Sequence, residues 1–153
     1  MRFGNLDGRA VLITDGGAID VHTASDGRFG PSPAECYEQW ADLRTWAATA
    51  TTSAAAFDPA KLGAPSPNPR QSIGIGLNYA KHAAEGGIPV PEFPTTFTKF
   101  PSCLGGPNDP VALPSAGVDW EVELVVVIGA TAHKVGRADG WAHVAGLTIG
   151  QDL

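Results

Sequence analysis

The sequence predicts an α+β protein that is mainly β, on three observations. Short runs of β-branched and apolar residues recur along the chain, as is typical of strands. The 19 glycines and 13 prolines fall between these runs and not in repeats, which indicates many turns. One segment carries a clear helix start. With 153 residues, 43% of them hydrophobic, the chain can form one domain, or one domain with a small appendage.

Charge, apolar runs and cysteines narrow the class of protein. The formal net charge of −6 argues against nucleic acid as the main partner, because binding to phosphates needs a basic face. No apolar run approaches the length that crosses a bilayer, and the first residues lack the apolar core of a signal peptide. Cys36 and Cys103 have no CxxC spacing, so we expect reduced thiols in a cytoplasmic protein.

The first third of the chain predicts a small β-meander followed by a helix. Apolar runs at 10–13 and 18–21 are bounded by Asp-Gly turn signals. A capping box then opens the helix, with Ser32 as the N-cap, proline next and glutamate three residues after the cap. Trp40 and Trp46 could line a ligand cage, but their helical spacing favours a place in the core.

A proline-rich crossing segment follows, over residues 48–72. The seven residues from 63 to 69 include three prolines, so regular structure is excluded there. We therefore predict a boundary near residue 70. It separates an appendage of residues 1–70 from the first part of the main domain, residues 71–153.

The segment 72–85 predicts a strand and then a short helix. Small and apolar residues alternate up to residue 77, without the full spacing of a dinucleotide-binding loop. Asn78 is expected to cap a helix over 79–85 that two glycines end. His82 and Glu85 lie three residues apart, hence on one helix face where they can hydrogen-bond. An ordinary surface pair is the alternative.

Three more strands are expected beyond this helix, at 95–100, 111–114 and 144–150. Lys99 lies in the first of them. It is either a rim lysine or a contact to an anionic substrate.

Residues 119–129 form the most informative strand of the sequence. Alternation places Glu121 and Glu123 on one face, followed on that face by two valines, while the other face is wholly apolar. Two like charges on a face that continues into a core are unfavourable unless a positive group lies between them. A divalent cation is the simplest such group.

Four motifs occur in a familiar order across residues 73–152. They are IGLNYAKHAAE, the pattern PxxPxxFxKxPS between residues 91 and 102, DWEVELVVVIG and VAGLTIGQD. In this order they closely resemble the fumarylacetoacetate hydrolase family. That family also includes acylpyruvases, diketo-sugar-acid hydrolases, oxaloacetate decarboxylases and catechol-pathway isomerase/decarboxylases. Residues 1–70 resemble the variable N-terminal portion of longer members only loosely.

The resemblance implies a fold, a metal site and a water-activating pair. The fold would be a mixed β-roll, incomplete in this chain. Glu121, Glu123 and Asp152 would hold Mg²⁺ or Mn²⁺, since these hard cations prefer oxygen ligands. His82 would take a proton from water while Glu85 orients the imidazole. The metal would chelate a 2-oxo acid and stabilise the enolate released on carbon–carbon cleavage.

The resemblance also implies the reaction and the assembly. We expect a hydrolase that cleaves a β-diketo acid of the acylpyruvate or fumarylacetoacetate type, with Lys99 and Gln151 as further substrate contacts and a homodimer as the assembly. A decarboxylase, isomerase or hydratase acting through the same enolate is the alternative. Because family members continue well past the aspartate, we also expect a truncated chain. It would be inactive by itself and would need the missing C-terminal part.

Overall fold

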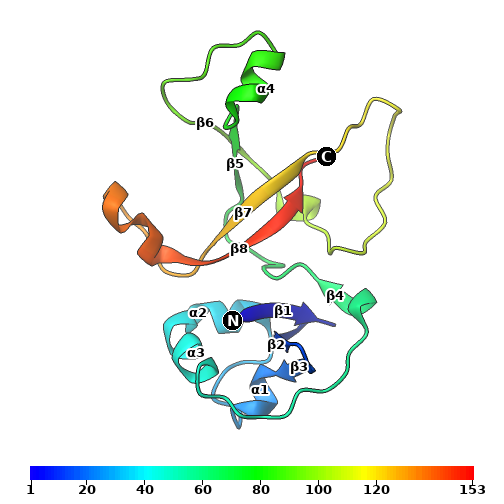
Figure 1. Cartoon of the computed structure of the whole chain (residues 1–153), viewed down its shortest axis with the longest axis vertical. Helices are drawn as coiled ribbons and strands as arrows, with labels where there is room; N and C mark the ends of the chain where they lie inside the picture. Colours follow the sequence, from blue (N-terminus) through cyan, green and yellow to red (C-terminus); the bar gives the residue numbers. More distant parts are fainter. The chain divides into compact units, whose positions relative to one another are not determined.

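The computed structural model describes all 153 residues, and its elements confirm the α+β class (Figure 1). The chain forms two compact units, Met1–Pro67 together with Gly105–Leu153, and Asn68–Leu104. The boundary near residue 70 stays a prediction. None of the helices combines the length and the apolar content needed to span a bilayer.

The predicted meander forms the first sheet. β1 (Arg2–Leu6), β2 (Arg9–Thr14) and β3 (Gly17–Asp20) pair antiparallel, and β4 (Leu62–Gly63) adds to the free side of β1. Asp7 and Gly8 connect β1 to β2, with φ values of 51° and 83°. Positive φ at both positions suits a two-residue hairpin whose twist matches that of the strands.

Three helices follow, where the sequence predicted one helical segment. They are α1 (Val21–Ala24), α2 (Pro33–Glu38) and α3 (Trp40–Ala47). The predicted capping box is confirmed, because the Glu35 amide donates to the Ser32 hydroxyl and the Ser32 amide donates to the Glu35 carboxylate. Between α2 and α3, the backbone of Gln39 leaves the helical region, with φ −122° and ψ 32°.

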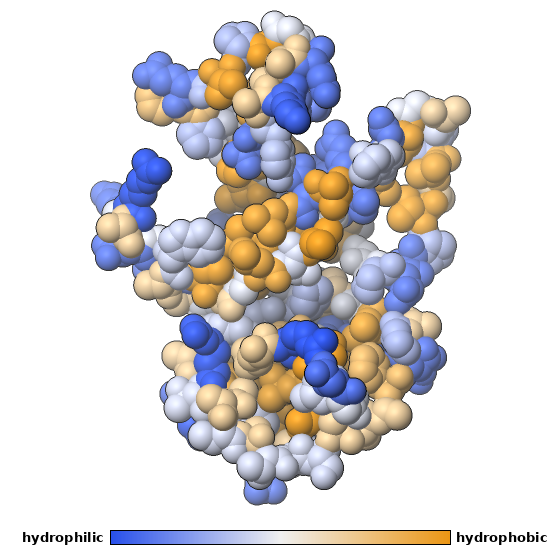
Figure 2. Space-filling view, viewed as in Figure 1, coloured by the Kyte–Doolittle hydropathy of each residue, from blue (hydrophilic) through white to orange (hydrophobic).

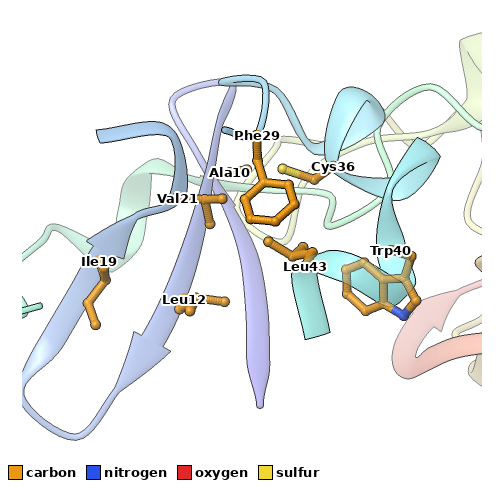
Figure 3. Close-up of a cluster of buried hydrophobic side chains, with 8 residues drawn as sticks. All are labelled: Ala10, Leu12, Ile19, Val21, Phe29, Cys36, Trp40 and Leu43. Atoms are coloured by element: carbon orange, nitrogen blue, oxygen red, sulfur yellow. The ribbon is translucent and has the colours of Figure 1, made fainter. Parts of the chain in front are cut away.

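The core of the first unit lies between this sheet and the helices (Figure 3). Trp40 belongs to it, and Trp46 packs at its edge, 5.5 Å from the ring of Phe29, so the expectation of core tryptophans is confirmed. Burial raises the pKa of the Cys36 thiol to about 11, which leaves the thiol protonated at neutral pH. The buried members are Ala10, Leu12, Ile19, Val21, Phe29, Cys36, Trp40 and Leu43.

A bidentate ion pair joins β2 to the start of α1. Arg9 donates to the Asp20 carboxylate from Nε at 2.6 Å and from Nη2 at 2.9 Å, and the Thr23 amide donates to it at 2.8 Å. The hydrogen bond from Arg9 is the main reason why the pKa of Asp20 lies far below its ordinary value. Such a carboxylate stabilises the folded state above its unfolded pKa of about 3.9.

We therefore predict that Asp20→Asn removes part of the acid sensitivity of folding. The difference in unfolding midpoint between wild type and variant should be largest near neutral pH and should shrink below about pH 4, where the unfolded Asp20 takes up a proton. Urea unfolding across this range measures it. Asp15→Asn is the matched control. The Asp15 side chain is fully exposed in its ion pair with Arg2, and exposed pairs contribute little to stability. Equal pH profiles for Asp20→Asn and wild type would contradict the prediction.

The second half of this unit is a long hairpin. β7 (Val122–Ile128) and β8 (Val144–Gln151) pair antiparallel, with the 3₁₀ helix η3 (Arg137–His143) between them. At its base, Gly129 donates to the His143 carbonyl at 2.9 Å. A Cβ on Gly129 would lie 2.7 Å from Ala145 Cβ and 2.9 Å from Trp40 Cδ1. The hairpin base therefore packs directly on the N-terminal core.

The strand predicted at 111–114 was wrong. Prolines stand on both sides of the run Val111–Leu113, at 110 and 114, and proline cannot donate to a ladder. These residues have no strand partner, and the apolar side chains of Val111 and Leu113 are exposed.

The other unit is built on a second hairpin. β5 (Ile73–Gly76) pairs with β6 (Thr95–Thr98), α4 (Ala80–Glu85) follows β5, and the 3₁₀ helix η2 (Pro101–Cys103) follows β6. Gly74 leaves room for the ring of Phe97, since a Cβ there would lie 2.3 Å from that ring. The expected Asn78 cap was wrong. Tyr79 takes that position, and its side chain makes no capping bond.

One face of the β7–β8 pair is apolar and exposed to solvent. Figure 2 shows hydrophobic side chains along these two strands, and the same set faces outward by register. Its members are between 43% and 74% exposed: Val122, Leu124, Val126, Leu147 and Ile149. The first unit thus buries its N-terminal apolar residues and leaves these uncovered.

Candidate metal and catalytic site

Three carboxylates lie at one end of the β7–β8 ladder. Glu123 is paired with Gly150, and the Asp152 amide donates to the Glu121 carbonyl at 3.0 Å, which continues the ladder by one step. Residues directly opposite each other in an antiparallel pair share a face. The register therefore gives Glu121, Glu123 and Asp152 the same face of the hairpin.

The face beside Glu123 is closely packed at Gly150. This cross-strand partner of Glu123 has no side chain, and a Cβ there would lie 2.9 Å from Val125 Cγ2, so the valine fills the space over the glycine. The donor set is all carboxylate oxygen, which suits Mg²⁺ or Mn²⁺. The side chains share a face without converging, because no three His, Cys, Asp or Glu side chains form a group that could hold a metal ion.

Gln151 lies apart from these carboxylates. It is paired with Val122, so the register gives its side chain the opposite, apolar face of the hairpin. The structure therefore does not bring Gln151 together with the three carboxylates, although it is their neighbour in sequence.

His82 and Glu85 form a loose, solvent-exposed pair on α4. His82 Nδ1 lies 3.9 Å from Glu85 Oε2, which is too long for a hydrogen bond. The side chains are 63% and 79% exposed. The i,i+3 spacing thus places them on one helix face as predicted, while the expected hydrogen bond is not made. Catalytic hydrogen bonds are often long without substrate, so the 3.9 Å distance does not by itself exclude a catalytic role for the pair.

Lys99 lines a small cavity that carries positive charge. This cavity of about 210 Å³ lies beside the β5–β6 hairpin, and Arg70 and Thr98 are also in its wall. The ammonium of Lys99 is 5.7 Å from the centre of the Phe97 ring. Arg70 was missed in the sequence analysis. Its position at the end of the proline-rich segment, just before a strand, was the available signal.

Comparison with known proteins decides the family. The family described as "Fumarylacetoacetate (FAA) hydrolase C-terminal" matches residues 71–153, more than half of the chain. The chain belongs to the fumarylacetoacetate hydrolase family.

Two solved structures resemble the chain throughout its length. A "putative HpcE protein" from Mycobacterium smegmatis matches with a TM-score of 0.92 and 46% identity, over 99% of this chain and 55% of that one. The maleylpyruvate hydrolase of Sphingobium sp. SYK-6, in complex with manganese(II) and pyruvate, matches with a TM-score of 0.74 and 27% identity, over 97% of this chain and 57% of that one.

Sequence relatives agree with this placement. A Burkholderia ambifaria (strain MC40-6) protein named "Putative hydrolase" is 42% identical over 140 residues, which are 84% of this chain and 49% of the relative. A Burkholderia lata protein with the same general name is 48% identical over 109 residues. The chain spans about half the length, or less, of the curated relatives that it matches.

Proposed function

We propose that this member of the fumarylacetoacetate hydrolase family is a divalent-metal-dependent hydrolase. It would cleave a carbon–carbon bond in a β-diketo acid of the acylpyruvate or fumarylacetoacetate type. The observation that carries the proposal is the shared face of Glu121, Glu123 and Asp152. The structurally similar maleylpyruvate hydrolase, in complex with manganese(II) and pyruvate, supports both the metal and a 2-oxo acid ligand.

The three carboxylates would hold Mg²⁺ or Mn²⁺. When bound, such an ion supplies a Lewis acid that orients a 2-oxo acid and stabilises negative charge developing on its oxygens. The ammonium of Lys99 would attract the carboxylate of the substrate. The proposed products of an acylpyruvate and one water are a carboxylic acid and pyruvate.

The proton transfers would belong to His82 and Glu85. His82 would take a proton from water, and the oxygen of that water would attack the acyl carbon next to the breaking bond. The proton would then go to the carbon that becomes the methyl group of pyruvate. Glu85 would stabilise the imidazolium between these steps, which requires a side-chain rotation that shortens the 3.9 Å separation.

An assay of pyruvate release tests the proposal. With Mg²⁺ present, the full-length protein should release pyruvate from at least one member of a panel of acylpyruvates, as followed by coupling to lactate dehydrogenase. A chelator should abolish the release, and added Mn²⁺ or Mg²⁺ should restore it. No release from any member of the panel would contradict the hydrolase proposal.

Replacement of His82 by alanine separates hydrolysis from the alternative reactions. Loss of a general base lowers the rate of hydrolysis by about 10²–10⁴-fold. Decarboxylation, isomerisation or hydration of a 2-oxo acid needs the metal but does not necessarily need this base. Exposed His133 gives the matched control, His133→Ala, which should keep full activity. If His82→Ala loses hydrolysis and retains decarboxylation of oxaloacetate, the second class of reaction is favoured.

A further inference from the structure

Leu77 joins β5 to α4 and has an unusual backbone conformation. Its φ is +52°, in the left-handed region. Among the non-glycine residues, Asp7, Asp26 and Lys134 also have positive φ. The two aspartates each precede a glycine, in turns where a short polar side chain tolerates this conformation. Leu77 is the only apolar member of the set. For a bulky residue, this conformation is a steric outlier of the kind found at functional sites.

The helix that follows Leu77 has little other support. Ala83 is the only buried residue of α4, and the N-cap residue Tyr79 makes no side-chain capping bond. His82 and Glu85 are both exposed and face each other loosely. A helix of six residues with one buried side chain, that of an alanine, has few packing contacts to orient it. Its direction depends on the connecting backbone at its two ends.

The two ends of α4 differ in how well the residue there suits its backbone conformation. At the C-terminal end, Gly87 has a φ of +64°, which glycine adopts freely, and the Ile88 amide donates to the Ala83 carbonyl at 2.9 Å. At the N-terminal end, the turn depends on Leu77, a residue that disfavours the conformation it has. A change from left-handed to extended backbone at this position would redirect the whole helix.

We propose that Leu77 is a positioning residue for the His82–Glu85 pair. Its left-handed backbone sets the direction in which α4 leaves β5, and so places the imidazole that accepts the proton from water. The proposal rests on the proposed hydrolase function. It concerns the conformation at residue 77 and not a contact made by the leucine side chain.

A pair of substitutions separates conformation from side chain. Leu77→Asn and Leu77→Val both remove the leucine δ carbons, but asparagine tolerates positive φ and a β-branched residue does not. We expect Leu77→Asn to keep kcat within about twofold of wild type, and Leu77→Val to lower kcat about tenfold with KM unchanged. Ile75→Val, in the extended backbone of β5, is the matched control and should have wild-type kcat.

Amide hydrogen exchange gives a readout that does not depend on activity. The Gly86 and Ile88 amides, which donate to the His82 and Ala83 carbonyls, should exchange faster in Leu77→Val and at the wild-type rate in Leu77→Asn. Equal losses of kcat in the two variants would overturn the proposal, because the side chain would then matter. Equal exchange rates of the Gly86 and Ile88 amides in Leu77→Val and in wild type would also overturn the proposal. If wild-type protein hydrolyses no acylpyruvate, the proposed function fails, and exchange alone then decides whether Leu77 orients α4.

Discussion

Replacement of Glu123 by glutamine should abolish metal-dependent pyruvate release and weaken Mn²⁺ binding strongly. The substitution keeps the shape of the side chain and removes one of the three charges on the shared face. Loss of a residue that only hydrogen-bonds to a metal ligand lowers the affinity for the metal by about 10–100-fold. Loss of a ligand itself should lower this affinity at least as much. Calorimetric titration with Mn²⁺ and the coupled pyruvate assay measure the two effects.

Glu92→Gln is the control for this change. Glu92 is an exposed carboxylate of the other unit, so its loss changes the net charge equally without touching the hairpin. It should leave both Mn²⁺ binding and activity at wild-type values. Unchanged Mn²⁺ affinity in Glu123→Gln would show that the ion binds elsewhere, and would remove the basis of the proposed metal site.

Replacement of Trp40 by alanine should have the largest effect on stability. Trp40 is 8% exposed, and the centre of its ring lies 5.1 Å from that of Phe3, in a T-shaped pair, and 5.0 Å from that of Tyr37. It also contacts the hairpin base at Gly129, so the substitution leaves a cavity between the N-terminal core and β7. Truncation of a buried tryptophan costs about 3–5 kcal/mol of the free energy of unfolding.

Urea unfolding of Trp40→Ala should be compared with that of Trp141→Ala. Trp141 is 70% exposed, so its truncation should change the free energy of unfolding by no more than about 0.5 kcal/mol. A loss below about 1 kcal/mol for Trp40→Ala would mean that the core closes around the missing ring or does not depend on it.

Local signals account for the parts of the fold that the sequence predicted. The capping box at Ser32 and the Asp7-Gly8 hairpin each depend on residues within a few positions of one another, so they can be recognised without tertiary information. The β7 strand was predicted because its run of β-branched residues is long and uninterrupted. Alternation along that strand also predicted the shared face of Glu121 and Glu123.

The features that were missed depend on contacts between distant residues. Residues 62–63 pair with β1, which lies more than fifty residues earlier in the chain, and no short motif predicts this pairing. The β7–β8 register places Asp152 on the same face as Glu121 and Glu123 and Gln151 on the other face, and this register cannot be predicted from a local motif. The start of α4 at Ala80 follows from the backbone turn at Leu77, where sequence preference and structure disagree. The homodimer and the cytoplasmic location remain expectations.

Because the apolar face of β7 is exposed, we expect the proposed ligands to have a second role, in keeping the protein dissolved. The sequence VELVVVI of β7 has a single charge and no proline, and segments of this kind readily pair between molecules. Glu121 and Glu123 are the charges that interrupt such pairing, so they would act as gatekeepers before any ion neutralises them. We therefore expect Glu123→Gln to scatter more light than Glu92→Gln at equal concentration. The same carboxylates would then link metal supply to colloidal stability.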